Sequence, residues 1–260
     1  MEGLRALYAA WCHAVPFDNV RKLIHVRNAD PAPLPGSTPR DFFESWLRWG
    51  AGGTCWVVAG ALHCLLESLG FPAQRGIATM LVVPHLPPNH GTVIVTFDGV
   101  RYLLDGGMLH GEPLRLDEMR ETSIDHPAWG VRCAFDEGRW TVRWRPLHLH
   151  HGLDCRLETI GATAEQYFER YQNTRGWSPF NYELSVRLNQ GGNVNGTAFG
   201  QWVTFGNDGS IASEPVSHQD RLRRLVEEIG LSEEIVARIP VDVPTPPPPG
   251  TKTAAEALNG

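Results

Sequence analysis

The chain has 260 residues, of which 42% are hydrophobic and 20% are charged, and its formal net charge is −6. This composition is typical of a globular protein with enough residues for one large domain or for two to three small ones around a shared core. The negative charge argues against nonspecific nucleic-acid binding, which relies on basic patches.

The first fifty residues favour two helices. Apolar residues recur at helical spacing over 4–11, and Pro16 ends that helix. After a polar loop, Thr38 is a suitable N-cap with Pro39 in the first helical position, and Gly50 ends the second helix.

A third helix is predicted to begin at Thr54 or Cys55 and to end at Gly70. Apolar residues recur along it every three to four positions, which indicates that one face packs on a core. The first residue of this helix is therefore expected to be held firmly.

From Ala73 onward the pattern favours strands. The strands expected in the middle of the chain are 77–83, 90–97, 100–105, 139–145 and 154–159. Asp98-Gly99 joins the second and third of them, and this dipeptide between two apolar runs is a strong hairpin signal. The later elements expected are a helix at 164–171, a strand at 184–188, an Asn/Gly-rich turn at 189–196, a strand at 198–205 and a helix at 220–229.

The five cysteines are widely spaced, odd in number and include no CxxC pair. That usage argues against a disulfide framework and a structural zinc site, and it favours a reducing compartment. Residues 1–15 contain no apolar stretch long enough for a signal peptide, and no window has the length of a membrane span. We therefore expect a cytoplasmic protein with no membrane or nucleic-acid partner.

Cys55, His90 and Asp105 can form a nucleophilic site. A two-residue hairpin turn places Val93 opposite Leu104, so His90 lies on the same face as Asp105 and diagonal to it. The carboxylate can then accept a hydrogen bond from one imidazole nitrogen and leave the other nitrogen for a third group. Cys55, at the positive end of a helix dipole, is the candidate for that group.

Each of these residues also has a structural interpretation. A cysteine is often a small buried apolar residue, a histidine at a strand start is often a surface or capping residue, and an aspartate before two glycines often forms a turn. The three placements together point to catalysis, with Gly52 and Gly53 leaving backbone amides free for an oxyanion. The spacing of these residues in the sequence does not show that the helix beginning at Cys55 contacts the hairpin that carries His90 and Asp105.

The same residues resemble the arylamine N-acetyltransferase family. His13-Ala14-Val15-Pro16-Phe17-Asp18-Asn19 resembles the family stretch H-x-x-V-P-F-E-N, and Gly52-Gly53-Thr54-Cys55 resembles the nucleophile motif R-G-G-x-C. His90 and Asp105-Gly106-Gly107 resemble the family's His segment and its D-V-G-F-G segment. Ser178-Pro179-Phe180 resembles a short segment late in the family's chain.

The resemblance implies an α+β fold with a Cys-His-Asp triad at a junction of three parts. These are an N-terminal helical bundle (1–72) carrying the nucleophile, a central antiparallel β-barrel (73–162) carrying His and Asp, and a C-terminal α/β lid (163–240), before a Pro-rich tail (241–260). The residues expected beside the oxyanion and substrate are Gly53, Thr54, Trp56, Gly107 and Met108. No permanently bound cofactor and no metal are implied.

Three departures from the family pattern are visible. Ala51 replaces the arginine of R-G-G-x-C, so we expect a structural ion pair to be missing. Met108 and Leu109 replace the aromatic residue and the second glycine of D-V-G-F-G, in a loop that lies close to the acyl donor in the family. These changes indicate a divergent member, in which the usual binding of coenzyme A is in question and a larger thioester is an alternative donor.

Three functions follow from the resemblance. The first is ping-pong transfer of an acyl group from a coenzyme A thioester to an arylamine or other small amine. The second is amide or macrolactam synthesis from a polyketide or peptidyl thioester on an acyl carrier protein, in natural-product biosynthesis. The third is a catalytically silent member that binds a ligand. His148 and His150 could share a strand face as a metal pair, but no third ligand is evident, and a solvated strand is the favoured interpretation.

Overall fold

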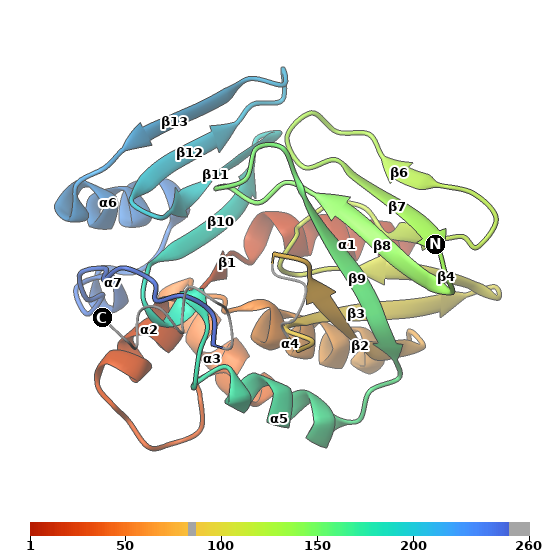
Figure 1. The fold of residues 1–260 in the computed structure, drawn as a ribbon, viewed down its shortest axis with the longest axis horizontal. Coiled ribbons are helices and arrows are strands. Elements are labelled where there is room, and N and C mark those ends of the chain that lie inside the picture. The colour runs from red at the N-terminus through yellow and green to blue at the C-terminus, as the bar shows by residue number, and fades with distance from the viewer. Residues whose placement is uncertain (83–86, 250–260) are drawn as a thin grey trace.

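The structure is a computed structural model that describes residues 1–82 and 87–249. It confirms the α+β fold, with a helical N-terminal region, a nearly closed antiparallel barrel of eight strands and a further sheet of five strands (Figure 1). Val83, where a strand was predicted to end, and residues 250–260 of the tail lie outside the described residues. The division into domains stays a prediction.

Four helices form the N-terminal region. They are α1 (Glu2–Ala14), α2 (Val20–Arg27), α3 (Pro39–Trp49) and α4 (Cys55–Ser68). The predicted N-cap of α3 is confirmed, because Thr38 accepts a hydrogen bond from Asp41 N, and Gly50 ends the helix in a left-handed conformation. Helix α2 was missed, since only the bend before it and the loop after it had been read from the sequence.

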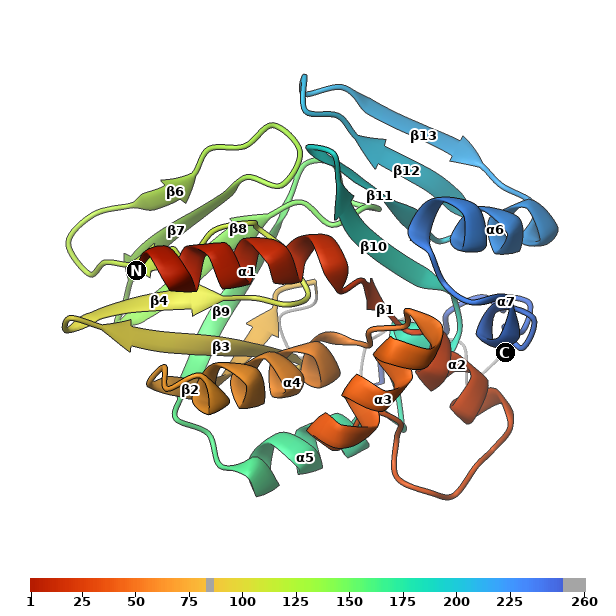
Figure 2. The same cartoon turned by 180° about the vertical axis from the view of Figure 1, so that it is seen from behind.

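The barrel strands follow the order β5-β4-β3-β2-β9-β8-β7-β6. Their bounds are β2 (Ala73–Met80), β3 (His90–Phe97), β4 (Val100–Leu104), β5 (Leu114–Leu116), β6 (Thr122–Ile124), β7 (Val131–Asp136), β8 (Arg139–Trp144) and β9 (Leu153–Ile160). The predicted hairpin register is confirmed, with Val93 opposite Leu104. Asp98 and Gly99 both have positive φ, as a tight hairpin turn requires. Helix α4 packs along β3 and β2, which brings its first residue to the barrel (Figure 2).

Some strand predictions were wrong at their ends or absent. The strand expected at 77–83 begins at Ala73 and ends at Met80, because Ala73 pairs with Val95 on β3 despite the polar residues that follow it. Strands β5, β6 and β7 were not predicted. Strands β5 and β6 have three residues each, too few for a clear alternation, whereas β7 alternates buried and exposed residues and could have been predicted.

The second sheet has the order β1-β10-β11-β12-β13. Its strands are β1 (Phe17–Asp18), β10 (Ser185–Gln190), β11 (Asn193–Ala198), β12 (Gln201–Phe205) and β13 (Ile211–Pro215). The turn predicted at 189–196 was wrong in extent, since it is confined to Gly191 and Gly192, and β11 follows at once. Strand β1, which belongs to the N-terminal region, is part of this sheet because it pairs with β10.

The C-terminal part of the chain also contains helical elements, of which α5 lies beside α4 and contacts β2 of the barrel. They are α5 (Ala164–Asn173), the 3₁₀ turn η1 (Pro179–Asn181), α6 (His218–Arg224), the π-helical turn η2 (Leu225–Ile229) and α7 (Glu233–Val236). The helix predicted at 220–229 therefore starts two residues earlier and changes to π geometry half-way. Residues 241–249 form no regular element, as predicted, but they pack on the protein: Trp177 donates to the carbonyl of Pro246. No helix in residues 1–82 and 87–249 is both long and apolar enough to cross a membrane.

Candidate active site

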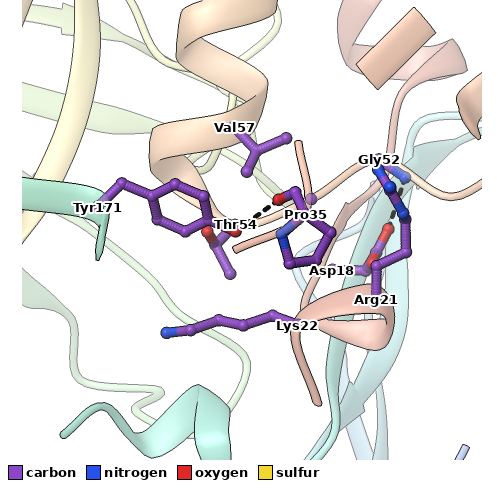
Figure 3. A pocket seen from close by; sticks show the side chains of 9 residues that line it. Asp18, Arg21, Lys22, Pro35, Gly52, Thr54, Val57 and Tyr171 are labelled. Atoms are coloured by element: carbon purple, nitrogen blue, oxygen red, sulfur yellow. Dashed lines mark hydrogen bonds between the residues drawn. The ribbon is translucent and has the colours of Figure 1, made fainter. Parts of the chain in front are cut away.

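Cys55 is the first residue of α4, directly after the N-cap Thr54. The loop before it is held by Asp18, whose N–H donates to Gly53 O at 3.1 Å and whose Oδ2 accepts from Gly52 N at 2.6 Å (Figure 3). Phe17 and Gly53 form a parallel bridge beside these bonds. The N-terminal chain thus fixes the loop that presents the cysteine.

His90 opens β3, and Asp105 follows the last residue of β4. His90 Nε2 lies 2.6 Å from Asp105 Oδ2, and both residues are buried. The other carboxylate oxygen, Oδ1, accepts from Gly107 N at 2.9 Å and from Met108 N at 2.8 Å. The diagonal pair expected from the hairpin is therefore formed.

The three predicted catalytic side chains meet around Gly107. A Cβ atom at Gly107 would lie 3.4 Å from Cys55 Cβ, from His90 Cε1 and from Asp105 Oδ1 alike. This contact supplies what spacing could not, because it joins the start of α4 to the barrel hairpin. The catalytic roles of the three residues stay a prediction.

The charges of these groups reinforce one another. Burial would lower the pKa of His90, but the Asp105 carboxylate and the Cys55 side chain, through its charge and a hydrogen bond, raise that pKa well above its ordinary value. Burial would likewise raise the pKa of Asp105, but His90 and the backbone donors hold it well below its usual range. The pair is therefore an imidazolium and a carboxylate at neutral pH.

A tyrosine that was not predicted from the sequence forms two hydrogen bonds with the backbone of Asp105. Tyr8 donates its hydroxyl hydrogen to Asp105 O at 2.8 Å, and its oxygen accepts from Asp105 N at 2.9 Å. Tyr8 lies on the buried face of α1, and its place in the apolar periodicity of that helix shows only that it is buried. The 97 residues between the two partners leave no local signal.

The other residues predicted beside the oxyanion and substrate differ in their surroundings. Thr54 is buried, and its hydroxyl has no hydrogen-bond partner among the described residues. Trp56 is buried and packs edge-on against Tyr167 of α5 at 4.9 Å between ring centroids. Met108 lies in the apolar core of the barrel. Thr54 thus adjoins the nucleophile, whereas Met108 points its side chain into the barrel.

Ala51 stands where the family motif has an arginine. Ala51 is buried among apolar residues, and no cation in the described part of the chain lies within 4.0 Å of the Asp18 carboxylate. The carboxylate instead accepts from Gly52 N and, through Oδ1, from Val20 N at 3.0 Å. Burial raises the pKa of Asp18 to about 6 against these bonds.

Leu109 keeps a glycine-like backbone. Its φ is +54°, in the left-handed region, although it is a branched residue. Its side chain is fully buried in the same apolar cluster as α1 and α4, and its carbonyl accepts from Asn189 at 2.6 Å. Burial of the leucine offsets a strain of roughly 1–2 kcal/mol for left-handed geometry. The loop therefore departs from the family in its residue while it retains a conformation that glycine favours.

Lys22 lies on the far side of the nucleophile loop. It helps to line a cavity of about 10 Å³ together with Gly53 and Thr54, which has room for about one water molecule. Its side chain extends away from Asp18, and its ammonium donates to the carbonyl of Thr174 at 3.4 Å (Figure 3). Burial lowers the pKa of Lys22 to about 7, which the nearby Cys55 partly opposes.

A family model described as N-acetyltransferase matches residues 1–147, more than half of the chain. The chain belongs to this N-acetyltransferase family. The resemblance read from the sequence is thereby confirmed. A search of curated proteins by sequence found no match.

Solved structures of arylamine N-acetyltransferases share the fold of this N-acetyltransferase family member. The M. smegmatis enzyme has a TM-score of 0.75 at 19% identity, covering 91% of this chain and 90% of its own. The Salmonella typhimurium enzyme has a TM-score of 0.72 at 18% identity, covering 88% and 84%. The Mycobacterium marinum enzyme in complex with CoA has a TM-score of 0.75 at 18% identity, covering 91% of each chain.

The histidine cluster shows no sign of a metal site. Among the described residues, no group of three or more His, Cys, Asp or Glu side chains is arranged to hold a metal ion. His148 and His150 instead pack edge-on against Phe199, in the turn between β11 and β12, and against Phe205 of β12.

Proposed function

We propose that this family member transfers an acyl group from an acyl-coenzyme A thioester to an arylamine or another amine, through an acyl-Cys55 intermediate. The observation that carries the proposal is the meeting of Cys55, His90 and Asp105 around Gly107. Membership of the N-acetyltransferase family and the CoA-bound M. marinum relative support the choice of donor.

In the first half-reaction, the Cys55 thiolate attacks the carbonyl carbon of the thioester. The protonated His90 stabilises the thiolate beforehand, and Asp105 stabilises the imidazolium and fixes the ring through Nε2. When the tetrahedral intermediate collapses, the carbon–sulfur bond to coenzyme A breaks and the leaving sulfur takes the proton from His90. An acyl-Cys55 thioester and a neutral imidazole remain.

In the second half-reaction, the amine attacks the acyl-Cys55 carbonyl. His90 removes the proton from the nitrogen as the new amide bond forms, and the bond to Cys55 Sγ breaks to regenerate the thiolate and imidazolium. The donors for the oxyanion are the amides of Cys55 and Trp56 at the start of α4, since Val57 N already donates to Thr54 O. The bonds from Asp18 to Gly52 and Gly53 keep that turn in place.

No observation favours a carrier-protein-bound thioester or a silent binding role over this reaction. Both alternatives stay open to the same experiment. Incubation with acetyl-coenzyme A, followed by intact mass measurement, is expected to show a gain of one acetyl group that peptide mapping places on Cys55. Addition of an arylamine is expected to remove the adduct and to release the N-acetyl product.

The matched control is a second cysteine on the same helix. Cys64 lies near the other end of α4 and is only partly buried. Cys55→Ala is expected to abolish the adduct and to lower turnover by about a thousandfold or more, whereas Cys64→Ala keeps both. An adduct that survives Cys55→Ala, or none with acetyl-coenzyme A in the unaltered protein, would contradict the proposal.

A further inference from the structure

A large groove lies apart from the candidate catalytic residues. It has a volume of about 380 Å³ and is bordered by the end of β6, the start of β7, the end of β8 and the segment 145–152. This volume falls in the range of roughly 300–1,000 Å³ that small-molecule sites occupy. None of Cys55, His90 and Asp105 lines it.

Strand pairing places this groove at the same end of the barrel as His90. On β2 and β9, Ala78 pairs with His90 and Met80 pairs with Cys155. The pairing continues to β8 through Leu153 and Trp144, which lines the groove. The groove and the candidate catalytic pair therefore lie on one rim of the barrel.

The groove is cationic in a chain of net negative charge. Arg132, Arg143 and Arg145 line it together with one carboxylate, Asp125. Arg132 pairs with Glu121 at 3.5 Å and Arg143 with Asp154 at 2.9 Å, both outside the lining. His126 and His151 also line it and add positive charge when protonated. Guanidinium groups pair with phosphate through two parallel hydrogen bonds, so a group of three selects a multiply charged oxyanion.

Arg145, which lines the groove, and Arg187, which donates to the carbonyl of Arg145, have no carboxylate partner among the described residues. Within the described residues, no Asp or Glu oxygen lies within 4.0 Å of Arg145 or Arg187. Arg187 is only 4% exposed, donates to the carbonyl of Arg145 at 2.7 Å and leaves its buried Nε without a partner. Burial and the charge of Arg145 lower the pKa of Arg187 to about 10. Two unpaired guanidinium groups beside one another are stabilised by an anion.

Aromatic side chains also line the groove. The ring of Trp144 lines the groove and lies 5.6 Å from the guanidinium of Arg187. His126 stacks on Trp129 at 3.5 Å between ring centroids, which holds the imidazole at the groove edge. A ligand that combines phosphate with an organic body would contact both the arginines and these rings.

We propose that this groove binds an organic phosphate. The ligand can come from two sources with the same chemistry: the phosphorylated part of the coenzyme A donor, or a free nucleotide. The proposal concerns binding and does not depend on the proposed acyl transfer. Nucleic acid is disfavoured by the net charge of −6.

The test is calorimetric titration of the full chain with coenzyme A, ATP and inorganic phosphate as separate probes. Strand β8 supplies a matched pair of variants. Arg143 and Arg139 are both 52% exposed at the side chain, and they pair with Asp154 at 2.9 Å and with Glu158 at 3.0 Å, both on β9. Only Arg143 lines the groove.

Arg143→Gln is expected to weaken binding of the organic phosphate by about fivefold to tenfold, and Arg139→Gln by less than about twofold. Arg132→Gln, at the exposed rim, is expected to weaken it in the same direction as a second variant. An effect on coenzyme A alone identifies the donor as the ligand, and equal effects on coenzyme A and ATP identify a general nucleotide site.

Equal responses of Arg143→Gln and Arg139→Gln would overturn the proposal. So would the lack of saturable binding of both coenzyme A and ATP, or saturation by inorganic phosphate only. The acetyl adduct on Cys55 is measured separately. If the adduct forms while groove variants bind normally, the groove proposal fails alone; if the groove binds while no adduct forms, the proposed reaction fails alone.

Discussion

Two aspartates of this chain are both fully buried, yet their acidities shift in opposite directions. Asp105 accepts from two backbone amides and faces His90 at 2.6 Å, and its pKa lies well below the usual range. Asp18 also accepts from two backbone amides, but no cation of the described chain lies within 4.0 Å, and burial raises its pKa to about 6. Backbone donors alone do not offset burial here, whereas donors plus an adjacent cation do.

The comparison separates two kinds of site around Cys55. The barrel side, with Asp105 and His90, is arranged to hold charge at neutral pH, as a proton-transfer site requires. The helix side, with Asp18 and Lys22, holds charge poorly, and Asp18 serves to fix the loop at Gly52 and Gly53. The predictions that follow test this division.

The largest effect is expected for Asp105→Asn. The amide keeps the shape and an acceptor for Gly107 N, but it removes the charge that raises the pKa of His90. We expect the rate of Cys55 acylation to fall by about a thousandfold to ten-thousandfold. The measurement is single-turnover acylation across pH, with an unfolding curve to check stability. A loss of less than tenfold with the fold intact would show that the negative charge of Asp105 is not needed for the acylation of Cys55.

The next effect is expected for Lys22→Met, on stability. The pKa of Lys22 is lowered from 10.5 to about 7 in the folded chain, so the unfolded chain binds more protons across that interval. Stability of the unaltered protein should therefore rise with pH from about 7 to about 10.5. Methionine removes the buried charge and should stabilise the fold at pH 7 by about 3 kcal/mol.

Denaturant unfolding at several pH values measures this effect. Lys22→Arg is the control, because arginine stays protonated across this interval. It should also flatten the dependence of stability on pH, but it keeps the buried charge and should therefore destabilise the fold, not stabilise it. If Lys22→Met leaves the slope of stability against pH unchanged, Lys22 keeps its charge in the folded protein. That result would contradict the interpretation that the helix side holds charge poorly.

Local signals allowed much of the barrel side to be predicted. Asp98-Gly99 specifies a tight hairpin by itself, and the pairing of Val93 with Leu104 follows from it, as does the approach of His90 to Asp105. The start of α4 at Cys55 follows from glycines before an apolar helical pattern. These features depend on residues close in sequence.

The helix side could not be predicted in the same way. The bond from Gly52 N to Asp18 spans 34 residues, and the two-residue strand β1 exists only because it pairs with β10. Such contacts are set by tertiary packing, and neither propensity nor periodicity indicates them. The resemblance to the family suggested that an ion pair was missing at Ala51, but the direct bond to Gly52 that takes its place required the structure.

The smallest effect is expected for Asp18→Asn, again on stability against pH. The pKa of Asp18 rises from 3.8 to about 6 on folding, so the folded chain binds more protons across that interval. Its contribution to stability is complete below pH 3.8 and is lost as pH rises through about 6. Asparagine has no such proton, so the variant should gain about 2 kcal/mol relative to the unaltered protein between pH 4 and pH 7.

That relative gain separates charge from hydrogen bonding at Asp18. The loss of one acceptor for Gly52 N or Val20 N should cost about 1 kcal/mol at every pH, because an asparagine offers one oxygen where the carboxylate offers two. Urea unfolding of both proteins from pH 4 to pH 8 distinguishes the constant cost from the pH-dependent gain. A difference that does not change with pH would mean that Asp18 is ionised throughout, and that the two aspartates hold charge equally well.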